Sequence, residues 1–313
     1  QVAVDTPSMR MTYARLDGFS DQIAQAITNW QKLPSEAPIA LLIEEKQYAI
    51  AALLGIIKAG KAAVIYPPDL PQDRLTYLWN DCLKPLVLTS RSLLELTCQV
   101  VQSEKSLLIV DDLAREEEKI GGHAPLPDSQ PGDVALISYT SGSTGNPKGV
   151  LQSHRMILHS AYLHNTRLHL SPRDRTAILP SFGYGAAKTN IFAALLSGVT
   201  AFFPNQQQRN ISSLLEWLIQ EQITILGSPP IGFLRQIMEG MMSGSRLPHI
   251  RLVTMGGEDF YPRDVDRFWQ CFNPGTVLSF RLTGNEIELT TDLHLHPGME
   301  LPAEKVPVGY PVP

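Results

Sequence analysis

The sequence predicts an α/β fold of two similar subdomains, each a mostly parallel sheet covered by helices, in a layered αβαβα core. Short apolar runs without polar alternation recur along the chain, as in strands that are buried on both faces. Segments with helical spacing stand between these runs. The 313 residues are 43% hydrophobic and 18% charged, which is typical of a globular chain long enough for one large core or two subdomains.

Composition also argues against several classes of function. A net charge of -5, without a basic stripe, argues against nucleic acid as a partner. No apolar run is long enough to span a membrane and no signal peptide opens the chain, so we expect no membrane association and a cytoplasmic location. Cys82, Cys98 and Cys271 are too scattered for a disulfide framework or a metal site, and we expect reduced core thiols.

The first predicted subdomain, residues 1–133, has a strand–helix–strand order. Residues 1–10 lack a clear period and resemble the edge of something longer, whereas Thr12 is placed to cap a helix whose apolar positions begin at Leu16. Predicted helices then cover residues 48–59 and 72–81, and predicted strands cover residues 39–43, 62–66, 86–89 and 107–110. The acidic, then Gly- and Pro-rich stretch 111–133 is predicted to be an exposed connector.

A polar loop opens the second predicted subdomain, residues 134–300, between a strand at 134–137 and a segment of helical period at 150–170. Its glycines let N–H groups turn toward one point, its hydroxyls add donors, and its lysine brings positive charge. Because Pro147 precedes Lys148, the loop is not a Walker A loop. We predict an ATP-phosphate site; a Gly/Ser linker is the alternative, but it does not account for the flanking strand and helix. The candidate residues are Thr140, Ser141, Gly142, Ser143, Thr144, Gly145 and Lys148.

This loop resembles the phosphate-loop signature of the acyl-adenylate-forming superfamily, which includes the adenylation domains of nonribosomal peptide synthetases. The resemblance implies ATP, Mg²⁺ and a carboxylic acid substrate, joined as an acyl-AMP with release of pyrophosphate, and gives Lys148 and Thr144 catalytic roles. Residues 12–16 and 58–75 are similar to two further core motifs of adenylation domains, which are structural. Family members often have a histidine at the position of His154, but a packing or capping role is the expectation for it.

The second subdomain repeats the rhythm of the first. Predicted strands cover residues 199–203, 224–226, 251–254 and 276–279, and predicted helices cover 212–220 and 231–242. Gly256, Gly257 and Glu258 follow one of these strands, at the carboxyl end where open parallel sheets bind ligands. The family resemblance implies that this stretch contacts adenine. A tight turn with a helix-capping carboxylate is the alternative.

The segment 181–198 bears on substrate choice. Aligned with amino-acid-activating domains, Tyr184 and Gly185 fall where those domains have Phe-Asp, and the family's aspartate pairs with the substrate α-ammonium. Gly185 cannot supply that partner, so we expect an acid without an α-amino group in the usual place: a hydroxy, keto, fatty or aryl acid, or a β-amino acid held otherwise. A shifted register, with an acid elsewhere, is the alternative. Thr189 and Lys188 complete the predicted substrate pocket; Lys188 either meets a second acidic group on the substrate or is a surface lysine.

A second departure from the family lies at residues 280–286, which are similar to the family's Asn-x-Tyr-Gly-x-Thr-Glu. Glu286 is kept, and the resemblance makes it the Mg²⁺ ligand and a catalytic residue. Asn285 stands where the family has threonine and can donate to a phosphate oxygen. Phe280, Leu282 and Thr283 replace Asn, Tyr and Gly.

Residues 301–313 resemble the stretch that leads into a small β-barrel, and the motifs of the family's C-terminal lid domain are not in the sequence. We therefore expect the large N-terminal core of an adenylation domain, incomplete as an isolated chain, that activates an acid for an acyl or peptidyl carrier protein thiol. Two alternatives are left open. One is a catalytically impaired pseudo-adenylation domain with a structural or docking role in a megasynthase, and the other is an ATP-binding protein of different chemistry.

Overall fold

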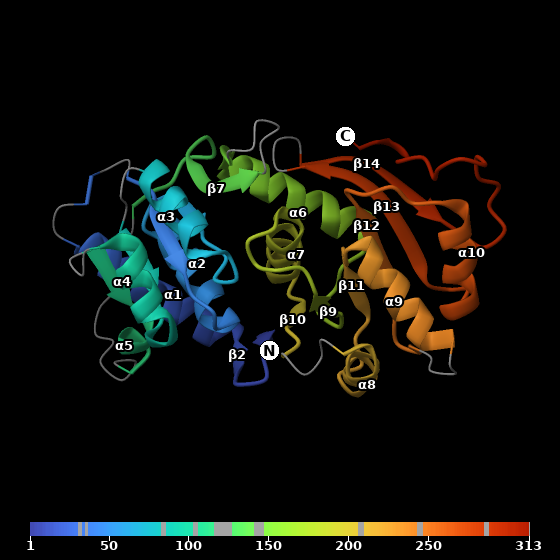
Figure 1. Cartoon of the computed structure of the whole chain (residues 1–313), viewed down its shortest axis with the longest axis horizontal. Helices are drawn as coiled ribbons and strands as arrows, with labels where there is room; N and C mark the ends of the chain where they lie inside the picture. Colours follow the sequence, from blue (N-terminus) through green and yellow to red (C-terminus); the bar gives the residue numbers. More distant parts are fainter. Residues whose placement is uncertain are drawn as a thin grey trace. The chain divides into compact units, whose positions relative to one another are not determined.

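The computed structural model describes residues 1–30, 33–34, 37–82, 86–102, 106–115, 127–140, 147–205, 210–242, 247–284 and 288–312. The chain divides into two compact units, and Figure 1 shows the elements of each. Unit 1 contains Gln1 and Met11–Ile157, and unit 2 contains Val2–Arg10 and Leu158–Pro313. Each unit has a mostly parallel sheet with helices, so the predicted α/β class is confirmed.

The sheet of unit 1 has the order β6-β5-β3-β4-β7-β8 within the described residues. All neighbouring pairs are parallel except β7 and β8, which form an antiparallel hairpin. The strands are β3 (Ile39–Leu42), β4 (Ala63–Ile65), β5 (Leu86–Thr89), β6 (Leu107–Ile109), β7 (Val134–Thr140) and β8 (Lys148–Ser153). The helices are α1 (Tyr13–Thr28), α2 (Lys46–Lys58), α3 (Gln72–Asp81), α4 (Leu94–Val101) and α5 (Val110–Arg115), with a 3₁₀ turn at Arg91–Leu93.

Local chemistry explains where α1 begins and how closely α2 packs against it. The Thr12 side chain accepts a hydrogen bond from the Arg15 backbone N–H, 3.2 Å away, so the predicted cap of α1 is confirmed. Helix α2 lies against α1 at a glycine, because a Cβ added to Gly55 would come within 2.6 Å of the Ile23 Cγ2 atom and 2.9 Å of the Ser20 carbonyl oxygen. The two helices can therefore pack this closely only because residue 55 has no side chain.

The phosphate loop differs from the predicted strand–loop–helix order. After the loop, the chain forms β8, which pairs with β7 with Lys148 opposite Thr140. Helix α6 (His154–Leu168) begins only after β8, so the helix expected from residue 150 is wrong over its first turn. The few apolar residues of β8 fit a helical period as well as a strand, which is why the period alone did not separate the two.

The sheet of unit 2 belongs to a nine-stranded sheet of order β15-β14-β13-β12-β11-β9-β10-β1-β2 in the described ranges. Strands β9 to β13 and β1 pair in parallel, and β14 and β15 are antiparallel. The strands are β1 (Val2–Asp5), β2 (Arg10–Thr12), β9 (Arg175–Ile178), β10 (Thr200–Phe202), β11 (Ile225–Gly227), β12 (Leu252–Gly256), β13 (Val277–Gly284), β14 (Glu288–Leu295) and β15 (Tyr310–Pro311). The helices after α6 are α7 (Gly185–Leu196), α8 (Ile211–Gln220), α9 (Ile231–Met242) and α10 (Pro262–Cys271).

The two faces of the unit 2 sheet differ in polarity. Val253, Leu278 and Phe280 belong to an apolar core that also contains residues of α8, α9 and α10. The alternate residues of β12 and β13, including Ser279 and Arg281, point to the opposite face, which α6 covers. Polar groups are thus buried between α6 and the sheet, where each needs a partner.

Three further predictions can be compared with the structure: the subdomain boundary, the state of the cysteines and the lack of a membrane span. The predicted boundary between residues 133 and 134 differs from the observed division after Ile157, because β7 and β8 extend the sheet of unit 1 through the β4–β7 pair. The three cysteines are free thiols, and Cys82 and Cys271 are buried. Among the described helices, none combines the length and apolar character that a membrane span requires.

The contact at Gly55 yields a stability prediction with an internal control. Gly55→Ala should lower the free energy of unfolding by about 1–3 kcal/mol, because the added methyl overlaps Ile23 and the Ser20 carbonyl oxygen. Gly18→Ala, in α1 with no atom within 4 Å of the added Cβ, should raise it by about 0.5–1 kcal/mol through helix propensity. Urea unfolding followed by circular dichroism measures both. If both substitutions raised the free energy of unfolding by the same amount, the close packing of α1 on α2 would be contradicted.

Candidate functional site

A cavity of about 570 Å³ opens in unit 2 at the carboxyl ends of its parallel strands. Residues that end or follow β9, β11, β12 and β13 line it, together with the first turns of α7 and one residue of α6. This is the edge at which open parallel sheets bind ligands. The lining residues are His164, Leu179, Pro180, Ser181, Tyr184, Gly185, Ala186, Thr189, Asn190, Ser228, Pro229, Pro230, Met255, Gly256, Glu258, Arg281, Thr283, Gly284 and Leu289.

Three of the four residues predicted for the substrate pocket lie on this cavity. Tyr184 is the N-cap of α7 and Gly185 its first residue, and Thr189 follows one turn later. The first turn of α7 contains no acidic residue. An added carboxylate at Gly185 would therefore stand at the cavity wall, where an ammonium group on a ligand could meet it.

Lys188 does not fit the prediction. It is not among the lining residues, and at 4% exposure it is buried in unit 2. The expectation of a surface lysine is therefore wrong. The neighbouring positions of α7 that do line the cavity are Thr189 and Asn190, so the helix turns Lys188 away from it.

The stretch predicted to contact adenine lies at the end of β12. Gly256 and Glu258 line the cavity, and Gly257 has φ +81°, a conformation that favours glycine. A Cβ at Gly256 would lie 2.6 Å from the Arg281 carbonyl oxygen, so the close approach of β12 and β13 requires glycine there. The exposed Glu258 carboxylate accepts a 3.4 Å hydrogen bond from the Ile231 backbone N–H at the start of α9.

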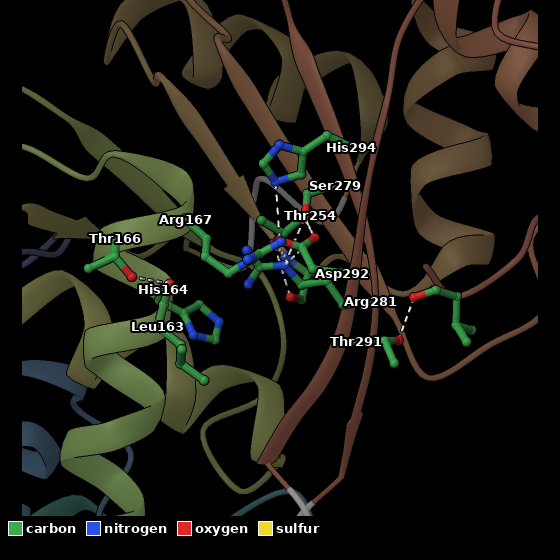
Figure 2. A network of polar contacts seen from close by, with 12 residues as sticks. Leu163, His164, Thr166, Arg167, Thr254, Ser279, Arg281, Thr291, Asp292 and His294 are labelled. Atoms are coloured by element: carbon green, nitrogen blue, oxygen red, sulfur yellow. Dashed lines mark hydrogen bonds and ion pairs between the residues drawn. The ribbon is translucent and has the colours of Figure 1, made fainter. Parts of the chain in front are cut away.

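A network of polar groups surrounds the buried Asp292 carboxylate of β14 and reaches Arg167 of α6 (Figure 2). Asp292 accepts hydrogen bonds from the Ser279 hydroxyl at 2.6 Å and from the Arg167 Nε at 3.0 Å. His294 Nε2 lies 3.1 Å from the same carboxylate. The Arg281 Nε donates to the Ser279 Oγ at 2.8 Å and lies 3.6 Å from an Asp292 oxygen. The Ser279 hydroxyl therefore links the Arg281 guanidinium to the Asp292 carboxylate.

The charges of this network shift the pKa values of its members. Burial opposes ionisation of Asp292, but the hydrogen bonds and charges of His294, Arg281, Ser279 and Arg167 outweigh it and hold its pKa well below the ordinary value. Burial lowers the pKa of Arg281 to about 10, so the guanidinium stays charged at neutral pH. With two guanidinium groups and one carboxylate, the network carries one excess positive charge.

Two cavity-lining residues have polar atoms without partners in the described part of the chain. The Nη1 and Nη2 atoms of Arg281 and the Nδ2 atom of Asn190 are buried and make no hydrogen bond there. Such atoms are rare in folded proteins, because each forfeits the hydrogen bonds it makes in water. Neither residue was predicted as a site residue, although an arginine among the mostly apolar residues 277–282 was a visible signal for one of them.

His164 lines the same cavity as a neutral side chain. Its Nδ1 lies 2.9 Å from the Ser160 carbonyl oxygen, which can only accept, so Nδ1 carries the proton. Burial, and then the Arg281 charge, lower the pKa of His164 to about 3. The imidazole is therefore uncharged at physiological pH.

The phosphate-loop residues are described only at the edges of the loop. Thr140 ends β7, and Lys148 begins β8 with an exposed side chain. Ser141, Gly142, Ser143, Thr144 and Gly145 lie outside the described residues, as do Asn285 and Glu286. Among the residues that are described, no cluster of three or more His, Cys, Asp or Glu side chains could hold a metal ion. The predicted roles of these loop residues and of Glu286 stay predictions.

Comparison with known proteins assigns the chain to a family. The family described as "AMP-binding enzyme" matches residues 1–313. The chain belongs to this family. It is 30% identical over 269 residues to gramicidin S synthase 2 of Brevibacillus brevis, covering 85% of this chain and 6% of the relative. It is 24% identical over 318 residues to tyrocidine synthase 1 of Brevibacillus parabrevis, covering 100% of this chain and 28% of the relative. The chain thus spans less than a third of the length of these two relatives.

Solved structures of similar proteins share the fold of this chain. The N-terminal subdomain of Klebsiella oxytoca NpsA, in complex with 3-hydroxybenzoyl-AMSN, superposes with a TM-score of 0.85 at 22% identity, covering 100% of this chain and 76% of that one. The nonribosomal peptide synthetase FmoA3, in an AMPPNP-bound form, superposes with a TM-score of 0.83 at 22% identity, covering 99% of this chain and 32% of that one. The predicted relationship to adenylation domains of nonribosomal peptide synthetases is confirmed.

The neutral His164 makes stability depend on pH. Its pKa is about 3 in the folded chain and about 6.5 when unfolded, so the unfolded chain binds more protons between these values. This group's contribution to stability is complete well above pH 6.5 and falls by about 1.4 kcal/mol for each pH unit below it. His164→Asn keeps a donor for the Ser160 carbonyl but does not titrate. Urea unfolding at pH 7, 6, 5 and 4 should show the wild type losing more stability than the variant. Parallel pH profiles would contradict a buried, neutral imidazole.

Proposed function

We propose that the chain is the N-terminal core of an adenylation domain, which joins a carboxylic acid to ATP as an acyl-AMP with release of pyrophosphate. The observation that carries this proposal is the cavity at the strand ends of unit 2, with Gly256 and Gly185 on its wall, in a chain that the AMP-binding family matches throughout. The activated acid would pass to the phosphopantetheine thiol of an acyl or peptidyl carrier protein. The names of the relatives, which are synthases of gramicidin S and tyrocidine, support such a partner.

The ligands of similar structures support the proposed chemistry. FmoA3 has been solved in an AMPPNP-bound form and in an α-methyl-L-serine-AMP-bound form. The NpsA subdomain has been solved with 3-hydroxybenzoyl-AMSN and with anthranilyl-AMSN. By analogy we propose that the cavity of unit 2 takes the acid, and that Gly256, Gly257 and Glu258 contact adenine.

The proposed chemistry needs little covalent work from the protein. The substrate carboxylate attacks the α-phosphorus, a P–O bond forms, and the bond to pyrophosphate breaks, so the chain's task is to stabilise negative charge. We assign this task to Lys148, Thr144 and the other loop donors, with Asn285 donating to a phosphate oxygen. Mg²⁺, which we propose to be held by Glu286, would add positive charge on the phosphate oxygens.

The first prediction from this proposal concerns ATP. Lys148→Ala should weaken binding of a non-hydrolysable ATP analogue by tenfold or more, because a charge-assisted contact to phosphate is lost. Lys148→Arg should keep most of the affinity, and Lys61→Ala, which removes a lysine elsewhere in unit 1, should leave it unchanged. Isothermal titration calorimetry measures all four proteins. Equal affinities would exclude Lys148 from the nucleotide site.

The second part of the proposal is that the acid has no α-amino group in the usual place. The α7 first turn offers no carboxylate, and the network beside the cavity has an excess positive charge that would repel an ammonium group. Glu258, the acidic residue on the cavity wall, is exposed and faces the start of α9. Moving an ammonium from water into such surroundings costs several kcal/mol, on the order of a hundredfold or more in specificity.

Gly185→Asp tests this substrate assignment. We expect kcat/KM in ATP–pyrophosphate exchange to favour an α-hydroxy or α-keto acid over the α-amino acid with the same side chain by more than about a hundredfold. The substitution should narrow this gap, since it gives the ammonium a partner and places an unpaired carboxylate beside the neutral acid. The exchange is measured with the natural polypeptide that carries this sequence. A preference for the α-amino acid that Gly185→Asp does not alter would place the ammonium site elsewhere.

One observation favours a second function, a non-catalytic docking unit. Phe280 stands where the family resemblance has asparagine, and it is buried in the apolar core with its ring 5.5 Å from that of Phe260. It thus contributes packing where the family pattern has a polar group. The exchange assay separates the two functions, because a docking unit supports no exchange with any acid.

A further inference from the structure

We propose that Arg281 selects an acid that carries a second carboxylate, so that the substrate class is a dicarboxylic acid. This inference rests on the proposed function and narrows it. It starts from the two terminal nitrogens of a guanidinium group that is 2% exposed, lines the cavity of unit 2, and leaves both nitrogens without partners in the described part of the chain.

Hydrogen bonds on the side of the guanidinium that carries Nε fix the orientation of Arg281. Its Nε donates to the Ser279 Oγ at 2.8 Å, and this hydroxyl in turn donates to Asp292 at 2.6 Å (Figure 2). Because Nε is engaged, the two terminal nitrogens are the donors of Arg281 that are left for a ligand. These present parallel N–H groups in the fork that matches the two oxygens of a carboxylate.

The charge balance points to an anion rather than to a neutral acceptor. Arg167 and Arg281 share the single Asp292 carboxylate, and Arg167 already binds it at 3.0 Å. His164, which also lines the cavity, is neutral because burial and the Arg281 charge lower its pKa to about 3. One positive charge is left at the edge of the cavity, and a ligand carboxylate would neutralise it.

The Asn190 amide is a second donor on the cavity wall. The Asn190 Nδ2 atom is buried on the cavity wall and also lacks a partner among the described residues. Its position is restricted by the sheet, since a Cβ at Gly227 would lie 2.8 Å from this atom. Carboxylate oxygens have several lone pairs, so one carboxylate can accept from Arg281 and from Asn190 together.

The ligand carboxylate bound here is not the one that reacts. The group to be adenylated must reach the α-phosphorus, whereas a carboxylate held by a guanidinium is neutralised and a weaker nucleophile. The proposal therefore requires two carboxylates on one substrate, one held by Arg281 and one free to attack phosphorus. A monocarboxylic acid of the same length would leave the buried charge unpaired, which is costly.

The test compares matched acids that differ only in the second carboxylate: pentanedioate with pentanoate, and benzene-1,3-dicarboxylate with benzoate. Calorimetry on the wild-type chain should show at least tenfold tighter binding of the dicarboxylate in one pair, equivalent to about 1.4 kcal/mol. Arg281→Met should abolish that preference, and Arg281→Lys should keep part of it. No preference in the wild type overturns the proposal, whatever the variants do.

Arg167→Lys is the matched control. Arg167 contacts the same Asp292 carboxylate but does not line the cavity, so this substitution alters the network while keeping its positive charge and the ligand donor. This variant should keep the preference for dicarboxylates. An equal loss in Arg167→Lys and Arg281→Met would assign Arg281 a structural role and overturn the proposal.

The outcomes also separate this inference from the proposed function. Pyrophosphate exchange with monocarboxylic acids only, unaffected by Arg281→Lys, would keep adenylation and exclude a second carboxylate. Arg281-dependent binding of a dicarboxylate, with no exchange for any acid in the natural polypeptide, would keep the inference and exclude adenylation.

Discussion

The structure of unit 2 depends on the contacts of the buried Asp292 carboxylate. Its oxygens hold Arg167 of α6 and Ser279 of β13, and its strand is paired on both sides, with β13 and with β15. The approach of β15 is close, because a Cβ at Gly309, where φ is +89°, would lie 2.3 Å from the Asp292 carbonyl oxygen. A carboxylate this deeply buried is stable only while its partners stay in place. The contacts of Asp292 therefore fix the positions of α6, β13 and β14 relative to one another.

Much of the fold could be predicted from the sequence because many elements are locally encoded. The helices at residues 72–81 and 231–242 have the predicted bounds, and Thr12 caps α1 as its hydroxyl chemistry suggests. The errors lie where a long-range pairing decides the structure. Strand β8 takes residues that carry a helical period, and β13 continues through Arg281 to Gly284 because β12 and β14 bond to it on both sides.

The candidate site shows the same limit. Gly185, Thr189, Gly256 and Glu258 line one cavity, as residues at strand ends and helix starts of a parallel sheet should. Lys188 was misplaced because its exposure depends on which side of α7 meets the sheet. Arg281 was missed because its importance arises from a shortage of partners, and a sequence does not show which donors find an acceptor.

The close contact at Gly256 divides the cavity wall into two kinds of surface. Where β12 runs against the Arg281 carbonyl oxygen, the wall is main chain, and any side chain at residue 256 would push the strands apart. That part of the wall is the same whatever acid the site accepts. Positions of α7 on the wall, such as Gly185 and Thr189, belong to a helix and not to the sheet, so they can change without moving the strands. A new substrate preference can therefore evolve on α7 and at Arg281, while the β12 wall stays fixed.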